Sequence, residues 1–155
     1  MDKDLNKIHA LMRQLFGLVH RLEDEAIKAS EFSDLSRAEI SAIMAIGTGR
    51  PKTMTHVANI LEINVSTLTT TINKLVKKGY VERLRDDKDR RIVKIGLSEK
   101  GIAAATERDS FMGELLRGAV EQVEPDKLRY FISAIDNINQ YFMAKSSMSY
   151  LKTTP

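Results

Sequence analysis

Two short amphipathic segments joined by a tight connection constrain the fold of this chain more than any other feature. Apolar residues recur at helical spacing in both segments: Val57, Ala58 and Leu61 in "TMTHVANILE", and Leu68, Ile72 and Leu75 in "NVSTLTTTINKLVKKG". The small Ala58 stands where two helices must approach closely, and Ile63 stands where the turn needs a core contact. The spacing therefore predicts a helix-turn-helix unit, whose second helix projects its first residues from the surface. Many such units carry glycine at the turn, where this chain has Glu62.

A charged stretch between two alternating segments follows the second helix. The segments "YVERL" and "RIVKIGL" are rich in β-branched residues that alternate with other types, which predicts the two strands of a hairpin. Six consecutive charged residues, 86–91, stand at the tip. One interpretation is a solvated turn. The other is a pair of arginines, Arg90 and Arg91, aimed at an anionic partner, with Asp89 on the same side of the strand as Arg91 to hold its guanidinium group.

Long amphipathic helices are predicted on both sides of this central part. Ser36 with Glu39 three residues later forms a capping box, Ser98 is placed to cap a long helix, and Pro125 stands near the start of a last one. The tail 146–155 is expected to be frayed. The apolar stripes of the flanking helices are Leu5, Ile8, Leu11, Met12, Leu15, Val19, Leu22 and Ile27, then Ile102, Ala105, Met112, Leu115, Leu116, Ala119, Val120 and Val123, and finally Leu128, Phe131, Ile132, Ile135, Ile138 and Phe142. The predicted fold is mainly α: a winged helix-turn-helix with a two-stranded β wing, flanked by N- and C-terminal helices.

Composition limits the classes of protein that fit this sequence. A chain of 155 residues, 43% apolar and 29% charged, is long enough for one globular domain. The absence of cysteine excludes a disulfide framework, a thiolate metal site and a cysteine nucleophile. No uncharged apolar run approaches the roughly 18 residues that a membrane span needs, so we expect a cytoplasmic protein without a membrane partner. Between residues 50 and 100, 12 lysines and arginines stand against 6 acidic residues. Such a local excess is typical of a nucleic-acid contact surface.

The second helix of the predicted unit presents a polar face opposite its apolar one. That face suits the major groove of duplex DNA, roughly 12 Å wide, because its side chains are short and hydroxyl-bearing, with Lys74 and Lys77 available for phosphates. A polar solvent face is the alternative, but neighbouring threonines are poor helix formers and are unusual there. The expected DNA contacts in the two helices are Thr55, Ser66, Thr67, Thr69, Thr70, Asn73, Lys74 and Lys77.

The charged hairpin gains a function beside such a helix. A wing after a recognition helix reaches the neighbouring minor groove, where arginine enters the negative potential of a narrow A/T tract. We expect Arg91 to be inserted, Asp89 to orient it and Arg90 to contact a phosphate. The helix itself offers no arginine or glutamine for bidentate base contacts. Because Asn73 suits adenine and threonine methyl groups suit thymine methyl groups, the expected operator is A/T-rich.

The run from Thr53 to Gly101 resembles the winged helix-turn-helix core of the MarR family of bacterial transcription regulators. The resemblance rests on Lys78, Gly79 and Tyr80 after the recognition helix, Asp89 and Arg91 in the wing, and Leu97, Ser98 and Gly101 at the following junction, where Ser98 replaces the family's threonine. It implies one MarR-like domain over residues 1–155, with a DNA-binding lobe at 36–100 and dimerisation helices at 1–30 and 101–146. It also implies a homodimeric repressor on pseudo-palindromic double-stranded DNA, with half-sites about one turn apart. The wide apolar stripes agree, since a chain this short could hardly cover them alone.

The resemblance also implies an effector. Family members commonly bind an amphipathic ligand between the dimerisation helices and the DNA-binding lobe. The stretch "TTTINKLVKKGYVER" is similar to repressors of fatty-acid synthesis genes, whose co-repressor is an acylated carrier protein. A small amphipathic molecule or an acyl-carrier protein is therefore the expected effector, and plain core packing is the alternative interpretation. The pocket residues would be Met12, Phe16, Val19, Ile43, Met44, Phe111 and Met112.

Other classes of function have weaker support. The histidines, His9, His20 and His56, form no cluster with metal-ligand spacing, so we expect no metal and no cofactor. No nucleophile with a neighbouring base, Gly-rich phosphate loop or paired-carboxylate motif stands out, so we expect no catalytic residues and no enzyme. Two alternatives to a DNA-binding regulator of this kind remain: a winged-helix adaptor that binds only protein, and a metal-sensing regulator.

Overall fold

The computed structural model describes residues 1–85 and 93–151, with side chains up to Lys145. The chain divides into two compact units, Met1–Phe111 and the part from Met112 onward. The first unit holds the helix-turn-helix and the strands, and each unit is described by itself below. The element order of the sequence-based prediction is confirmed, with one strand added.

The first unit contains the predicted helices at the predicted places. They are α1 (Asp2–Ala29), α2 (Arg37–Ile46), α3 (Met54–Ile60), α4 (Val65–Lys77) and the first part of α5 (Glu99–Val120). The capping box of α2 is confirmed: the Glu39 amide donates to the Ser36 hydroxyl, and the Ser36 amide donates to the Glu39 carboxylate. The predicted cap of α5 is confirmed as well, because the Gly101 amide donates to the Ser98 hydroxyl at 3.1 Å. Local polar signals thus fix where these helices begin.

The strands form a three-stranded antiparallel sheet in the order β1-β3-β2. The hairpin strands are β2 (Val81–Arg85) and β3 (Val93–Leu97), and the added strand is β1 (Lys52–Thr53), which pairs with β3. The prediction of a two-stranded wing was therefore incomplete. A strand of two residues is too short to show alternation in the sequence. In the register, Lys52 lies opposite Ile95, and its amine donates to the carbonyl groups of Ala45 and Ile46, which end α2.

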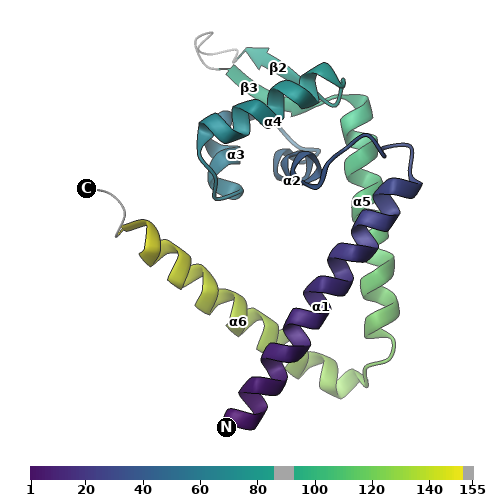
Figure 1. Cartoon of the computed structure of the whole chain (residues 1–155), viewed down its shortest axis with the longest axis vertical. Coiled ribbons are helices and arrows are strands. Elements are labelled where there is room, and N and C mark those ends of the chain that lie inside the picture. Colours follow the sequence, from purple (N-terminus) through teal and green to yellow (C-terminus); the bar gives the residue numbers. More distant parts are fainter. Residues whose placement is uncertain (86–92, 152–155) are drawn as a thin grey trace. The chain divides into compact units, whose positions relative to one another are not determined.

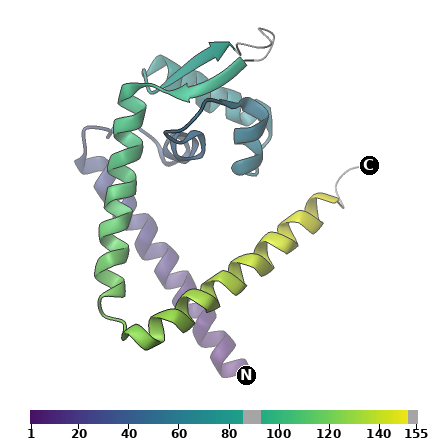
Figure 2. The same cartoon turned by 180° about the vertical axis from the view of Figure 1, so that it is seen from behind.

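The core of the first unit lies where α2, α3 and α4 meet the sheet and the start of α5. Figure 1 shows α4 beside β2 and β3, and Figure 2 shows β3 leading into α5. The buried apolar residues are Phe32, Leu35, Ala42, Ile43, Ala45, Ile46, Val57, Ala58, Leu68, Ile72, Leu75, Tyr80, Val81, Ile95, Ala104 and Ala105. All residues predicted to face inward in α4 are among them, so the opposite face of that helix is left for solvent or a partner.

Two tight turns set the ends of the helix-turn-helix. After α3, Glu62 adopts a positive φ of 54°, and the Ile63 amide donates to the Ala58 carbonyl group. After α4, Gly79 has a φ of 81°, and the Tyr80 amide donates to the Leu75 carbonyl group. In both turns, a residue in the left-handed backbone conformation ends the preceding helix. Glu62 occupies this conformation at a cost of about 1 kcal/mol that glycine would not carry.

The second unit is helical and very exposed. It holds the rest of α5 and α6 (Pro125–Leu151). The predicted fraying from residue 146 was wrong for 146–151, because α6 continues to Leu151 and neither glycine nor proline interrupts it. Between Pro125 and Lys145, every side chain except the half-buried Leu128 is exposed, including Phe131 at 50% and Phe142 at 55%. Within this unit, the predicted apolar stripe of α6 is therefore exposed apart from Leu128.

Candidate nucleic-acid interface

The outer face of α4 carries the residues predicted to contact DNA. With Leu68, Ile72 and Leu75 fully buried, the opposite face of the helix turns to solvent. The residues there are exposed, apart from the half-buried Thr69: Ser66, Thr67, Thr70, Asn73, Lys74 and Lys77. Thr55 is exposed on the neighbouring helix α3. The structure thus brings together, on one helix-turn-helix, all predicted contacts outside the hairpin tip.

The start of α4 is held by its own polar side chains. The Asn64 carboxamide oxygen accepts hydrogen bonds from the Thr67 amide and from the Ser66 hydroxyl, each at 2.7 Å. The Thr69 hydroxyl donates to the Val65 carbonyl group at 2.7 Å, and Thr70 donates to Ser66 at 3.4 Å. These hydroxyl protons are used inside the helix. What the threonines retain for a partner is their methyl groups and their remaining acceptor capacity.

Arg83 is a candidate contact that the sequence analysis missed. It lies on β2 directly opposite the fully buried Ile95, and therefore on the sheet face that packs against the helices. From there its guanidinium group donates to the Asn73 carboxamide oxygen at 2.6 Å. Both side chains are exposed. Alternation along β2 could have placed Arg83 on this face, but only the tertiary structure brings it to α4.

The predicted tip residues Asp89, Arg90 and Arg91 lie outside the residues that the structure describes. The described part of the hairpin ends at Arg85 and resumes at Val93, which pair with each other. Arg85 shares the sheet face of Arg83, two residues nearer the tip. The last described residues of β2 therefore continue the cationic surface from α4 along the strand.

A polar cluster, in which Glu39 and Tyr80 are buried, fixes the far end of α4 to the rest of the lobe. The Lys78 amine donates to the Glu39 carboxylate at 2.8 Å and to the Asp34 carbonyl group at 2.5 Å. The Tyr80 hydroxyl donates to the Asp34 carboxylate at 2.6 Å, and the Lys100 amine lies 4.1 Å from the centre of the Tyr80 ring. This Asp34–Glu39–Lys78–Tyr80 cluster joins the start of α2, the end of α4 and the start of β2.

The electrostatics of the cluster follow from its burial. Burial raises the pKa of Glu39, but hydrogen bonds from Lys78 and Ser36 outweigh burial, and the pKa lies below its ordinary value. Burial also raises the pKa of Tyr80, and the hydrogen bond to Asp34 adds to the effect. Glu39 is therefore a carboxylate at neutral pH, although it is only 4% exposed and one of its oxygens accepts no hydrogen bond from the described residues.

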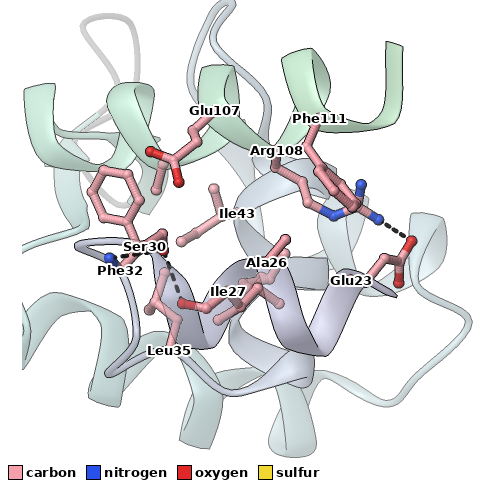
Figure 3. A pocket seen from close by; sticks show the side chains of 12 residues that line it. Glu23, Ala26, Ile27, Ser30, Phe32, Leu35, Ile43, Glu107, Arg108 and Phe111 are labelled. Carbon is pink, nitrogen blue, oxygen red and sulfur yellow. Dashed lines mark hydrogen bonds and ion pairs between the residues drawn. The ribbon is translucent and has the colours of Figure 1, made fainter. Parts of the chain in front are cut away.

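Among the hollows formed by the described residues of the first unit, two share part of their lining and include no residue of α4. Figure 3 shows the smaller, a cavity of about 40 Å³ lined by residues of α1, α2 and α5, where Arg108 forms an ion pair with Glu23. The larger is an open groove of about 410 Å³. The two share Glu23, Ile27, Ile40 and Arg108. A site for a small molecule needs roughly 300 Å³ or more, so only the groove has room for one.

The predicted pocket residues are divided between these hollows and the helix surface. Ile43 and Phe111 line the cavity, and Met44 lines the groove. Met12, Phe16, Val19 and Met112 line neither of the two. The first three precede Glu23 on α1 by at least one helical turn. The sequence analysis missed the charged lining residues Arg37 and Arg108, because a position on a polar helix face does not reveal which polar residues meet across helices.

Two features are absent from the part of the chain that the structure describes. No group of three or more histidine, aspartate or glutamate side chains there is arranged to hold a metal ion. None of its helices combines the length and the apolarity that crossing a bilayer requires.

The helix-turn-helix and the sheet packed beside it define a winged helix-turn-helix domain. A family model described as MarR family matches residues 33–92. The chain is 34% identical over 100 residues to the HTH-type transcriptional regulator SarZ of Staphylococcus saprophyticus, a match that covers 61% of this chain and 68% of that relative. The chain belongs to the MarR family.

Two further comparisons agree with this assignment. The uncharacterized HTH-type transcriptional regulator YpoP of Bacillus subtilis is 31% identical over 94 residues, 61% of this chain. The match spans 64% of YpoP, just under two thirds of that relative's length. The crystal structure of Streptococcus pneumoniae FabT in complex with DNA superimposes with a TM-score of 0.85 at 26% identity, and covers 90% of this chain and 97% of that one.

Proposed function

We propose that this chain is a sequence-specific DNA-binding transcriptional regulator that acts in the cytoplasm as a homodimeric repressor. The observation that carries the proposal is the outer face of α4: exposed, hydroxyl-rich and bordered by the cations Lys74, Lys77 and Arg83. Such a face has the width and charge for the major groove. The similarity to FabT, whose structure contains DNA, supports the same use of the fold.

The expected operator is A/T-rich. Thr69 and Thr70 use their hydroxyl protons inside the helix, which leaves their methyl groups for the methyl groups of thymine. The proposed wing contacts, Asp89, Arg90 and Arg91, would add a preference for a narrow minor groove. Their support is the Asp-x-Arg sequence at the end of a confirmed hairpin.

A second copy of the chain is the proposed partner of the exposed apolar stripes. On α1, Leu5, Leu11 and Leu15 are each more than half exposed, and no residue of that helix is buried. On α6, Phe131, Ile132 and Phe142 are at least half exposed. Apolar faces of this extent are characteristic of obligate interfaces. The helices 1–30 and 101–146 would thus join two lobes, each spanning about 36–100, into one dimeric molecule.

Selection of bound sequences from random duplexes tests this proposal. We expect the protein to enrich an A/T-rich pseudo-palindrome with half-site centres about one helical turn, roughly 34–36 Å, apart, because a two-fold dimer presents two α4 helices. Binding should weaken steeply with salt, since lysines and arginines release counterions from phosphates. A protein adaptor would enrich no motif and would show no duplex binding even at low salt. A direct repeat, or a half-site alone, would contradict the dimer.

We propose further that the 410 Å³ groove binds an amphipathic ligand, either a fatty acid or the acyl chain of a carrier protein. The groove is lined by apolar residues that include Ile40, Met44 and Leu61, and by the arginines Arg37 and Arg108. Each arginine already pairs with a carboxylate, Asp24 and Glu23 respectively. The carboxylate of an incoming fatty acid would compete with Asp24 and Glu23 for the two arginines. Its hydrocarbon chain would cover the apolar residues of the groove.

A long-chain fatty acid added to the protein bound to its selected duplex tests the groove. We expect the apparent affinity for DNA to change by about 5-fold or more, the lower end of ordinary allosteric coupling. The matched fatty alcohol lacks the carboxylate and should have a smaller effect. In the double variant Glu23→Gln/Arg108→Gln, which removes the pair without leaving one charge behind, the response to the acid should fall toward that of the alcohol, with Arg37 as the arginine that remains in the groove. An unchanged response in this variant would contradict the assignment.

A further inference from the structure

We propose that Arg83 and Asn73 together read a guanine in each half-site of the operator. The inference rests on the proposed function and concerns one position within the A/T-rich site. Its basis is the hydrogen bond of 2.6 Å that joins the strand β2 to the outer face of α4. Asn73 lies seven residues, or about two helical turns, after Ser66 and three residues after Thr70. It therefore continues the same exposed stripe of the helix.

The hydrogen bond fixes the orientation of the Asn73 carboxamide. A guanidinium group carries only donors, so Asn73 must present its oxygen to Arg83. Its amino group is then the part left for a partner. The pair therefore offers N–H donors from both residues and a net positive charge, with one of the two lone pairs of its acceptor oxygen already in use.

This arrangement changes what Asn73 can recognise. A bidentate contact with adenine requires the carboxamide oxygen to accept from the adenine amino group while the amide nitrogen donates to N7. Arg83 occupies one lone pair of that oxygen and places a positive charge beside the adenine amino group. Guanine instead presents two acceptors, N7 and O6, at the same edge of the major groove. The positively charged pair, in which donors outnumber free acceptor positions, matches guanine and opposes adenine.

The test is duplex selection with the wild-type protein and with Arg83→Ala. The wild type should enrich one G·C pair per half-site, and replacing it by A·T should weaken binding about 10-fold, within the range of a bidentate base contact. In Arg83→Ala the carboxamide is free to turn, so the same position should lose its preference for guanine or prefer adenine. Guanine replaced by 7-deazaguanine, which lacks the N7 acceptor, should weaken the wild type and leave Arg83→Ala nearly unaffected.

Arg85→Ala is the matched control, because it removes the same charge from the same face of β2. It should leave the preference for guanine intact. If Arg83→Ala keeps the wild-type base preferences and only binds more weakly at every sequence, Arg83 contacts phosphate and the inference is overturned while the proposed function stands. If the wild type enriches no motif at all, the proposed function fails, and the inference fails with it.

Discussion

Gly101→Ala should destabilise the protein by about 3 kcal/mol, although alanine is the better helix former. Gly101 lies in the first turn of α5, where the helix backbone meets the carbonyl group of Tyr80. A Cβ at this position would stand 2.1 Å from that oxygen, far inside van der Waals contact. The carbonyl group cannot turn away cheaply, because it accepts the Ser98 amide hydrogen bond at 3.0 Å. The start of α5 must shift, and with it the packing of Ala104 and Ala105.

Chemical denaturation at fixed protein concentration measures this effect, since the stability of a dimer depends on concentration. Gly113→Ala is the control in the same helix: no described atom lies within 4 Å of a Cβ there, and the residue is exposed. It should stabilise by up to about 1 kcal/mol through helix propensity alone. If both substitutions stabilise, the close approach at Gly101 is not the reason for a glycine at this position.

Signals confined to a few neighbouring residues were sufficient to predict most of the fold. The capping box of Ser36 and Glu39, the cap at Ser98 and the alternation in β2 and β3 are each complete within one short segment. The structure agrees with these predictions because local preference and tertiary packing favour the same conformation in these segments. The strand β1 was missed for the opposite reason. Its two residues become a strand only through pairing with β3, more than 40 positions later in the chain.

For the candidate site, the sequence predicted only which residues share a face of one helix or strand. The threonine face of α4 follows from helical spacing, once Leu68, Ile72 and Leu75 are assigned to the core. The contact between Arg83 and Asn73 joins two elements, as do the pairs of Arg108 with Glu23 and of Lys78 with Glu39. No spacing rule connects such residues. They follow from the packing of particular elements, which one sequence does not specify.

Lys78→Met should destabilise the protein by about 3 kcal/mol at neutral pH, the lower end for breaking a buried ion pair. The substitution removes the cation from Glu39, which is 4% exposed and has one carboxylate oxygen that already accepts no hydrogen bond from the part of the chain that the structure describes. The Ser36 amide would remain as a partner, but it cannot neutralise the charge. It also removes the hydrogen bond to the Asp34 carbonyl group, which helps to hold the end of α4. Lys74→Met, at an exposed position of the same helix, should change stability by about 0.5 kcal/mol or less.

The pH dependence of stability distinguishes two possible effects of Lys78→Met: the loss of the charge partner of Glu39 and the loss of side-chain packing. In the wild type the pKa of Glu39 is lowered on folding, so this group contributes stability above its unfolded pKa and loses it as the pH falls through the folded pKa. Without Lys78, the effect of burial, which raises the pKa of Glu39, is opposed less strongly. The unpaired carboxylate then destabilises the folded state at neutral pH, and protonation relieves this effect. The stability difference between wild type and Lys78→Met should therefore shrink between about pH 7 and about pH 4. Glu39→Gln/Lys78→Met, which carries no buried charge, should be more stable than Lys78→Met at pH 7. A difference that stays constant with pH, together with no recovery in the double variant, would mean that Lys78 acts through packing and not through its charge.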